Sequence, residues 1–246
     1  MKPVITIDNL AYSYPDGTEA LRGINLEIRE GESVALMGPN GAGKTTLFLN
    51  LNGLLTGKAG SVRVFGNTLD GKKSLKEARR RVGIVFQNPE DQLFCPTVFD
   101  DVAFGPLNYG LPSEEVRLRV RDALKSVGMS GFEERLSYHL SFGEKKRISL
   151  ATVLSMNPDA ILLDEPTSNL DPRARRKIIE VIRSLEIAKI IATHDLEMAL
   201  ELCDRGIIMD GGRVVADGRT EDILRNKILL ETHGLEVPYS LHGAAF

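Results

Sequence analysis

One eight-residue segment constrains this chain more than any other feature of its sequence. It reads Gly38-Pro39-Asn40-Gly41-Ala42-Gly43-Lys44-Thr45 and fits the pattern G-x-x-x-x-G-K-[ST]. A buried strand is predicted over Ser33 to Met37, and a short helix from Thr45 to about Leu51. Glycines let such a loop curl so that its backbone N–H groups point at phosphate oxygens, and the helix adds its positive dipole end. The segment therefore predicts a phosphate-binding loop in an open α/β fold.

The polar side chains near this loop predict how ATP and Mg²⁺ are held. Lys44 can reach the β- and γ-phosphates, and the hydroxyl of Thr45 can ligate Mg²⁺. A second segment, Ile161 to Glu165, is an apolar strand that ends in two adjacent carboxylates. We expect Asp164 to hold Mg²⁺, directly or through water, and Glu165 to polarise the attacking water. The loop residues predicted to bind the nucleotide are Gly38, Pro39, Asn40, Gly41, Ala42, Gly43, Lys44, Thr45 and Thr46.

A phosphate-binding loop alone does not identify the reaction, because kinases, GTPases and motor ATPases share it. A GTPase would normally also need an Asn-Lys-x-Asp guanine reader. The nearest match, Asn226 to Leu229, lacks the aspartate. We therefore expect ATP rather than GTP, while a P-loop kinase or another metabolic ATP enzyme stays open at this point.

The hydrophobic pattern predicts a P-loop NTPase core of α/β class, with a mixed sheet and an N-terminal antiparallel β part. Short apolar strands alternate with helices in the second half of the chain, as in an open sheet covered by helices. A helical stretch separates the two halves and predicts an inserted α-helical subdomain. The expected boundaries are 1–225 for the ATPase domain, 1–87 and 158–218 for its nucleotide-binding core, 88–157 for the insertion, and 226–246 for a peripheral helix and tail.

Composition narrows the setting and the partners. The 246 residues carry a formal net charge of −3, so no overall basic field indicates a nucleic-acid partner. Cys95 and Cys203 have no metal-type spacing and favour a reducing, intracellular setting. We expect neither a signal peptide nor a bilayer-spanning segment, because no stretch has the required apolar run. A role at a membrane would then need docking onto another subunit.

Five further features, in order along the chain, resemble the ABC-type ATPase family. Tyr14 matches the aromatic residue that stacks on adenine, and Gln87 matches the glutamine of the Q-loop. Leu140-Ser141-Phe142-Gly143-Glu144 matches the signature segment, which is usually Leu-Ser-Gly-Gly-Gln. Ser168-Asn169-Leu170-Asp171 matches the D-loop, and His194 matches the switch histidine. The resemblance runs from about residue 4 to residue 225.

The resemblance implies a catalytic set and a dimer. Glu165, His194 and Gln87 would be catalytic, with Gln87 contacting Mg²⁺ or the lytic water and His194 sensing the γ-phosphate. The signature segment would complete the ATP site of a second ATPase subunit, either an identical chain or a related paralogue. One chain would then hold two half-sites, and a head-to-tail pair would enclose two ATP molecules. The further residues implied in ATP binding are Ser141, Gly143, Glu144 and Asp171.

Phe142 and Glu144 depart from the usual signature segment. A phenylalanine does not readily take a positive φ, so the backbone N–H groups keep their orientation only if this position needs none. Glu144 in place of glutamine adds a negative charge near the γ-phosphate. The neighbouring Lys145, Lys146 and Arg147 are expected to offset that charge.

The sequence around Gln87 matches one branch of the family more specifically than the glutamine alone. Phe86 to Phe94, Asp101 to Pro106 and Asn108 to Leu111 resemble the ATPases of energy-coupling factor importers, which take up vitamins or transition-metal ions such as cobalt and nickel. In that family this region faces the integral membrane subunit, so we expect docking near Gln92, Leu93 and Phe94.

This branch of the family implies a peripheral protein at the cytoplasmic face of the cell membrane. The alternative is a non-transport ABC ATPase that acts on nucleic acid or in cofactor assembly. Proteins of that kind usually carry tandem cassettes, long coiled coils or strongly basic arms, and this sequence shows none of these features.

Overall fold

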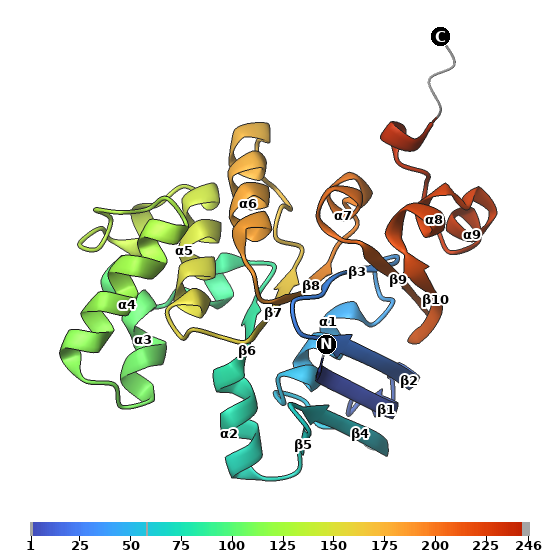
Figure 1. Cartoon of the computed structure of the whole chain (residues 1–246), viewed down its shortest axis with the longest axis horizontal. Coiled ribbons are helices and arrows are strands. Elements are labelled where there is room, and N and C mark those ends of the chain that lie inside the picture. Colours follow the sequence, from blue (N-terminus) through green and yellow to red (C-terminus); the bar gives the residue numbers. More distant parts are fainter. Residues whose placement is uncertain (1, 58, 243–246) are drawn as a thin grey trace.

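The chain folds into two β-sheets that enclose helix α1 (Lys44–Leu51) between them (Figure 1). The computed structural model describes residues 2–57 and 59–242. The smaller sheet is antiparallel, with the order β2-β1-β4-β5. Its strands are β1 (Pro3–Ser13), β2 (Glu19–Arg29), β4 (Ala59–Val64) and β5 (Asn67–Thr68).

The larger sheet has the order β10-β9-β3-β8-β7-β6. Its strands run parallel except for β10, which pairs antiparallel with β9. The predicted mixed sheet and the predicted antiparallel N-terminal part are therefore confirmed. The strands are β3 (Ser33–Met37), β6 (Val82–Val85), β7 (Ala160–Asp164), β8 (Ala188–Ala192), β9 (Arg205–Asp210) and β10 (Arg213–Arg219).

The larger sheet separates two hydrophobic cores. Successive side chains of a strand point to opposite faces, and β3 shows the consequence clearly. Val34 and Leu36 pack toward the smaller sheet and α1, while Ala35 and Met37 pack toward the helices on the other face. Because both of its faces are covered, β3 reads as a continuous apolar run in the sequence.

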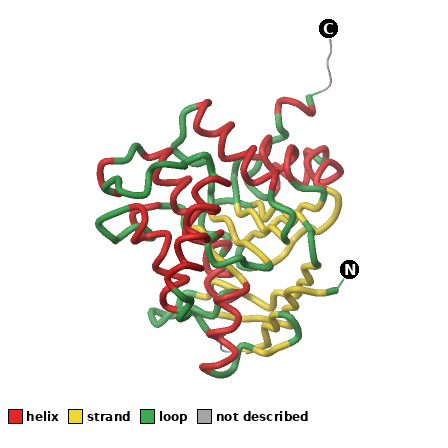
Figure 2. The backbone as a smooth tube through the Cα atoms, turned by 60° about the vertical axis from the view of Figure 1, so that its left-hand side comes forward, coloured by secondary structure: helices red, strands yellow, loops and turns green. Residues whose placement is uncertain are grey.

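The helices lie mainly on the face of the larger sheet opposite the smaller one. In Figure 1 α3, α4 and α5 form a separate layer at the left, and in Figure 2 the strands gather beside the helices. No helix in residues 2–57 and 59–242 is long and apolar enough to cross a membrane. The helices are α2 (Lys72–Arg81), α3 (Val98–Asn108), α4 (Ser113–Ser126), α5 (Phe142–Leu154), α6 (Pro172–Ser184), α7 (Leu196–Leu202), α8 (Thr220–Arg225) and α9 (Lys227–Thr232).

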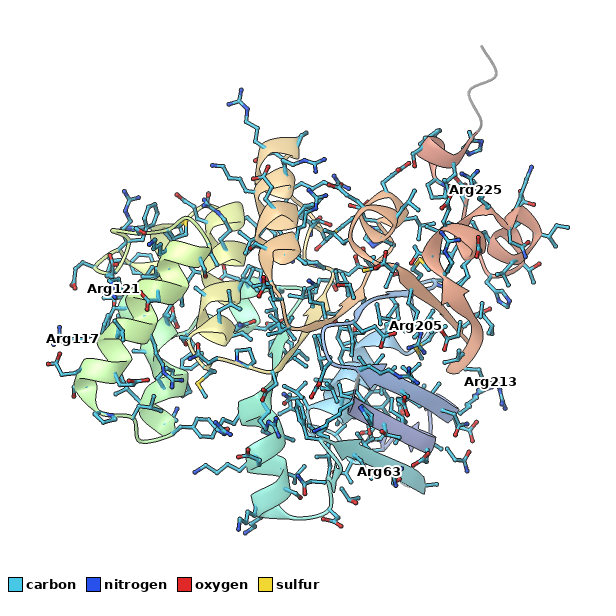
Figure 3. All side chains as sticks on the ribbon, in the orientation of Figure 1. Arg63, Arg117, Arg121, Arg205, Arg213 and Arg225 are labelled. Carbon is cyan, nitrogen blue, oxygen red and sulfur yellow. The ribbon has the colours of Figure 1, made fainter. Side chains whose placement is uncertain are left out.

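Arg205 ties the larger sheet to the smaller one (Figure 3). Its guanidinium donates to the carbonyl of Glu27 on β2 and to the carboxylate of Glu32, both at 2.9 Å. The same group forms a two-point contact with Asp217 on β10, at 2.7 Å for each bond. These hydrogen bonds, with Asp217 first, raise the pKa of Arg205 above its ordinary value. A planar donor with several N–H groups thus joins three strands at one point.

The segment after residue 225 differs from the peripheral helix and tail that the sequence predicts. Leu230 is fully buried and Leu235 is buried, and both belong to the core on the helical face of the larger sheet. Ser240 also binds Glu197 of α7 through its backbone N–H at 3.1 Å and its hydroxyl at 2.6 Å. The weak apolar pattern of this segment concealed the burial, because the apolar residues that pack against the core are spread along it without a regular spacing.

Docking through Leu93 would require an exposed side chain, and for this residue the prediction was wrong. The 3₁₀ helix η1 (Pro89–Asp91) turns the chain, and Leu93 is then 8% exposed in the helical core, while Phe94 is 65% exposed. Gln92 is also held inside, because its amide accepts from the N–H of Phe86 and donates to the carbonyl of Ser149. The acidic residues before Leu93 favour a solvent-facing loop, but they lie only on the outer side of this turn.

Leu93→Ala should lower the free energy of unfolding by ~2–5 kcal/mol, since it removes buried methyl groups and leaves a cavity. Phe94→Ala is the matched control and should change that free energy by less than ~1 kcal/mol, because its ring is mostly in solvent. Urea unfolding of both variants measures the difference. Equal midpoints for the two variants would contradict the burial of Leu93.

Candidate nucleotide-binding site

A cavity of about 660 Å³ opens where β3 and β7 end and α1 begins. It brings together residues that are up to 221 positions apart in the sequence, from Tyr14 to Leu235. Most of the residues that the sequence analysis singles out lie around it. These are Tyr14, Gly38, Pro39, Asn40, Gly41, Ala42, Gly43, Lys44, Thr45, Thr46, Gln87, Asp164, Glu165 and His194.

Two glycines of the loop are required by its surroundings. Gly38 has φ +146°, and a Cβ there would lie 2.1 Å from the carbonyl oxygen of Met209. Gly43 has φ +99°, and a Cβ there would lie 2.5 Å from the carbonyl oxygen of Ala20. Any side chain at either position would meet backbone that cannot move aside cheaply. The loop is thus wedged between β9 of the larger sheet and β2 of the smaller one.

Lys44 is held inside the loop, with 8% of the residue exposed. Its ammonium donates to the carbonyls of Gly38 at 2.7 Å and Pro39 at 3.0 Å. Burial lowers the pKa of Lys44, while the charges of Glu165 and Asp164 act in the opposite direction. A positive charge therefore lies at the wall of the cavity, where it can attract a bound anion.

Thr45 and Asp164 meet across the cavity, with the Thr45 hydroxyl donating to Oδ2 of the carboxylate at 2.7 Å. Asp164 is 4% exposed, and burial raises its pKa, partly opposed by the Thr45 hydrogen bond. Both offer hard oxygen donors, which Mg²⁺ prefers. The described residues form no group of three or more His, Cys, Asp and Glu side chains that could hold a metal. The pair therefore fits Mg²⁺, which takes its other ligands from phosphates and water.

Glu165 follows directly on β7 in a left-handed conformation, with φ +44°. Its N–H donates to the carbonyl of Ala192 at the end of β8, at 2.9 Å. The carboxylate contacts Nδ1 of His194 at 2.9 Å and accepts from the hydroxyl of Thr193 at 3.3 Å. Glu165 is 6% exposed, whereas the side chain of His194 is 64% exposed. A buried carboxylate and an exposed imidazole are thus paired at the cavity wall.

Tyr14 lies at the other end of the cavity, on the chain just after β1. Its hydroxyl and that of Thr46 are 2.9 Å apart, so it is anchored to α1. Its ring meets Tyr12 edge to face, with centroids 5.1 Å apart. This arrangement leaves a half-buried aromatic ring beside the loop, as an adenine-stacking role requires.

The predicted signature segment forms the beginning of α5. Ser141 caps the helix, and its N–H and hydroxyl both donate to Glu144 Oε2 at 2.8 Å. These bonds lower the pKa of Glu144, with the hydroxyl bond first. Phe142 is the first residue of the helix and does not have a positive φ. The N–H groups at the helix start therefore keep the orientation that an anion site needs.

Three basic side chains follow the capping box and direct their hydrogen bonds away from it. Lys145 forms an ion pair with Glu90, and Lys146 donates to the carbonyl of Glu165 at 2.8 Å. Arg147 donates to carbonyl oxygens at the end of α4. The expected offset of the signature carboxylate is confirmed for Arg147, whose charge helps to lower the pKa of Glu144 after the bonds of the capping box. It was wrong for Lys145 and Lys146, which bind other groups.

Asp171 caps α6 by accepting from the N–H groups of Arg173 at 2.8 Å and Ala174 at 3.0 Å. Those backbone bonds, with Ala174 first, lower its pKa. A Cβ at Gly143 would lie 3.0 Å from the Cβ of Ala174, so the starts of α5 and α6 pack closely. Among the predicted site residues, four lie outside the lining of the cavity: Ser141, Gly143, Glu144 and Asp171.

The chain after α9 contributes to the cavity, which the sequence analysis does not predict. Gly234 and Leu235 line it, and a Cβ at Gly234 would lie 3.9 Å from Pro39. His233 fixes this segment, because its Nδ1 lies 2.8 Å from a carboxylate oxygen of Asp210 at the end of β9. No spacing in the sequence links residues this far apart. The other lining residues that were not predicted are Thr18, Glu19 and Ala20.

A family model described as ABC transporter matches residues 21–168, which is more than half of the chain. The chain belongs to the ABC transporter ATPase family. An ABC transporter ATP-binding protein of Gloeobacter violaceus is 56% identical over 239 residues, covering 96% of this chain and 98% of the relative. The energy-coupling factor transporter ATP-binding protein EcfA of Methanothermobacter thermautotrophicus is 48% identical, covering 96% and 77%.

Solved structures of ABC ATPases share the same fold. The structure of cbiO1 from Clostridium perfringens, described as part of the ABC transporter complex cbiONQ, has a TM-score of 0.83 and 39% identity over 98% of both chains. A dimeric structure of the ATP-binding cassette MJ0796, bound to ADP and Pi, has a TM-score of 0.80 and 28% identity over 88% of this chain and 98% of that one. This ABC ATPase therefore resembles the ATPases of energy-coupling factor importers.

Proposed function

We propose that this ABC ATPase dimerises around two MgATP and uses their hydrolysis to drive an integral membrane subunit in the uptake of a transition-metal ion or a vitamin. The observation that carries the proposal is the meeting of Lys44, the Thr45–Asp164 pair and the Glu165–His194 pair in one cavity. Three chemical roles, namely phosphate binding, metal binding and water activation, then converge on one nucleotide.

Hydrolysis follows from this arrangement of side chains. The loop N–H groups and Lys44 bind the phosphates. Thr45, Asp164 and Gln87 would hold Mg²⁺, and the ion would supply positive charge to the β- and γ-phosphates. Glu165 accepts a proton from water as the water oxygen attacks the γ-phosphorus, and ADP leaves with the electron pair of the broken bond. His194 orients that carboxylate through Nδ1, and in the doubly protonated ring the other nitrogen can donate to the γ-phosphate.

The dimer is supported by the position of the signature segment. Ser141 presents a helix N-terminus and a hydroxyl outside the chain's own cavity, together with Gly143, so a second chain's ATP is their natural ligand. The solved structures of the cassette MJ0796 are described as dimeric, which supports the pairing of two chains. The second chain is an identical copy or a related paralogue.

The membrane subunit docks on an apolar surface formed by Phe94, Phe104 and Leu107. Their exposures are 65%, 47% and 53%, and the two rings meet edge to face with centroids 4.8 Å apart. This docking surface keeps Phe94 from the site predicted by sequence but leaves out Gln92 and Leu93. Leu93 is buried, and the amide of Gln92 is hydrogen-bonded within the chain. It lies at the helical layer of α3, beside a cavity of about 380 Å³ that Phe94 and Tyr138 line. The complex places the ATPase at the cytoplasmic face of the membrane as a peripheral subunit.

Glu165→Gln should bind MgATP and accumulate as a dimer, because the amide keeps the shape of the carboxylate but is no base. Hydrolysis should fall ~10²–10⁴-fold, the usual contribution of one positioned general base. Single-turnover hydrolysis and size-exclusion chromatography with MgATP measure the two effects. Glu186→Gln, an exposed position, is the control. If Glu165→Gln hydrolysed ATP in a single turnover at the wild-type rate, Glu165 would not be the base.

Phe94→Ala combined with Phe104→Ala should fold and hydrolyse ATP normally but fail to co-purify with the membrane subunit that the wild-type chain retains. Each truncated anchor at an interface costs ~2 kcal/mol or more, which together dissociate a moderate complex. Leu118→Ala on α4 is the matched control, since Leu118 is also an exposed apolar residue, at 45%. Normal co-purification of the double variant would place the docking surface elsewhere.

A further inference from the structure

Lys146 is a buried cation that the hydrolysis scheme leaves unused. It lies on α5, five residues after Ser141, and only 2% of it is exposed. Its ammonium donates to the carbonyl oxygen of Glu165 at 2.8 Å and lies 3.4 Å from the hydroxyl of Ser168. Ser168 in turn donates to the same carbonyl at 2.9 Å. A charged side chain of the signature helix thus binds the backbone of the residue proposed as the base.

The peptide that Lys146 binds is conformationally strained. Glu165 has φ +44°, a value that residues other than glycine and asparagine rarely adopt. The N–H of Glu165 is fixed by the carbonyl of Ala192 on β8, at 2.9 Å. Its carbonyl is fixed by Lys146 and Ser168. The backbone of Glu165 is therefore held at its N–H by the larger sheet and at its carbonyl by α5.

A structural role alone does not require a charge here. Burial lowers the pKa of Lys146 to about 8, while the carboxylates of Glu165 and Asp164 act in the opposite direction. A well-packed apolar side chain of similar volume often replaces a buried charge with no loss of stability. The buried ammonium of Lys146 therefore indicates that its hydrogen bonds to Glu165 and Ser168 have a role beyond packing.

A second contact joins the same two parts of the chain. Gly143, two residues after Ser141, packs against Leu170 of the predicted D-loop and against Ala174 in the first turn of α6. The start of α5 thus touches the segment after Glu165 at Gly143 and again at Lys146. Because an α-helix is stiff over one or two turns, a displacement at Ser141 moves both contacts together.

We propose that Lys146 is a positioning residue that couples the two half-sites within one chain, by tying the Glu165 peptide to the helix whose start binds the partner's ATP. The proposal rests on the function proposed above. When Ser141 and the first turn of α5 engage the ATP of the second chain, Lys146 holds Glu165 in the orientation that activates water in the chain's own site. Each chain then hydrolyses ATP at its full rate only when its signature helix is in place.

Lys146→Met tests the proposal, because methionine is of similar length and has no N–H to donate. It should leave the dissociation constant for ATP within about twofold and the melting temperature at or above that of wild type. Its kcat should fall about 10- to 100-fold with little change in KM, the usual effect of misplacing a catalytic group. Lys125→Met, an exposed position on α4, is the control and should hydrolyse ATP like wild type.

A conservative variant separates hydrogen bonding from packing. Lys146→Gln keeps a donor on a shorter side chain, so its kcat should lie between those of Lys146→Met and the wild type. It also keeps the proposal open to test if the methionine variant does not fold. A glutamine variant no better than methionine, in folded protein, would overturn the role of the donor.

A double variant distinguishes this proposal from the role of Glu165 itself. If Lys146 acts through Glu165, then Lys146→Met added to Glu165→Gln should lower kcat by less than about twofold more, because residues that act as a unit are not additive. A full additional loss would overturn the coupling while leaving the base in place. Unchanged kcat in Lys146→Met, or a rise in KM alone, would also overturn it. If Glu165→Gln instead hydrolysed ATP normally, the proposed function would fail first.

Discussion

The nucleotide site depends on the close approach of two backbone carbonyls to the phosphate loop. Met209 on β9 and Ala20 on β2 occupy the space where side chains at Gly38 and Gly43 would otherwise lie. The loop can take its curled shape only because glycine tolerates both the positive φ and the contact. Since the two carbonyls belong to different sheets, the site exists only when the sheets are docked. Arg205, which joins β2, β9 and β10, therefore supports the site from a distance.

The rest of the site follows from the topology of the larger sheet. Parallel strands deliver their carboxyl ends to one edge, and the order β3-β8-β7 places Asp164, Glu165 and His194 beside the loop. Helix α5 presents its own N-terminus outside this cavity. The chain thus contains two separate anion-binding features that it cannot bring onto one nucleotide, and this supports the proposed pairing of two chains.

The sequence predicted the parts of the site whose geometry is local. The loop from Gly38 to Thr45 and the carboxylates at Asp164 and Glu165 sit at strand ends, and strand ends are recognisable from the apolar runs before them. The fold class followed from the same runs. Residue roles and domain boundaries remain predictions, since geometry brings residues together without showing what each one does.

The errors concern burial that depends on distant contacts. Leu93 is buried because a 3₁₀ turn reverses the chain, while its acidic neighbours indicated exposure. Lys146 was expected to offset the nearby charge of Glu144, yet its partner is a carbonyl 19 positions away. Gly234 lines the cavity because of a histidine–aspartate contact across 23 positions. For Lys146 and Gly234 the deciding contact lies far along the chain and carries no local pattern.

The central claim, that each active site is built from two chains, is tested most directly by mixing two inactive variants. Lys44→Ala removes the phosphate-binding charge of one half-site, and Ser141→Arg blocks the other, so neither variant alone should hydrolyse ATP. In an equimolar mixture half of the dimers contain both chains, and each of these holds one complete site out of two. The account predicts a rate above the sum of the separate variants, with a ceiling of about a quarter of the wild-type rate for independent sites and a lower value where the coupling through Lys146 slows the chain whose signature helix is blocked. A mixture no more active than the sum of its separate variants would contradict it.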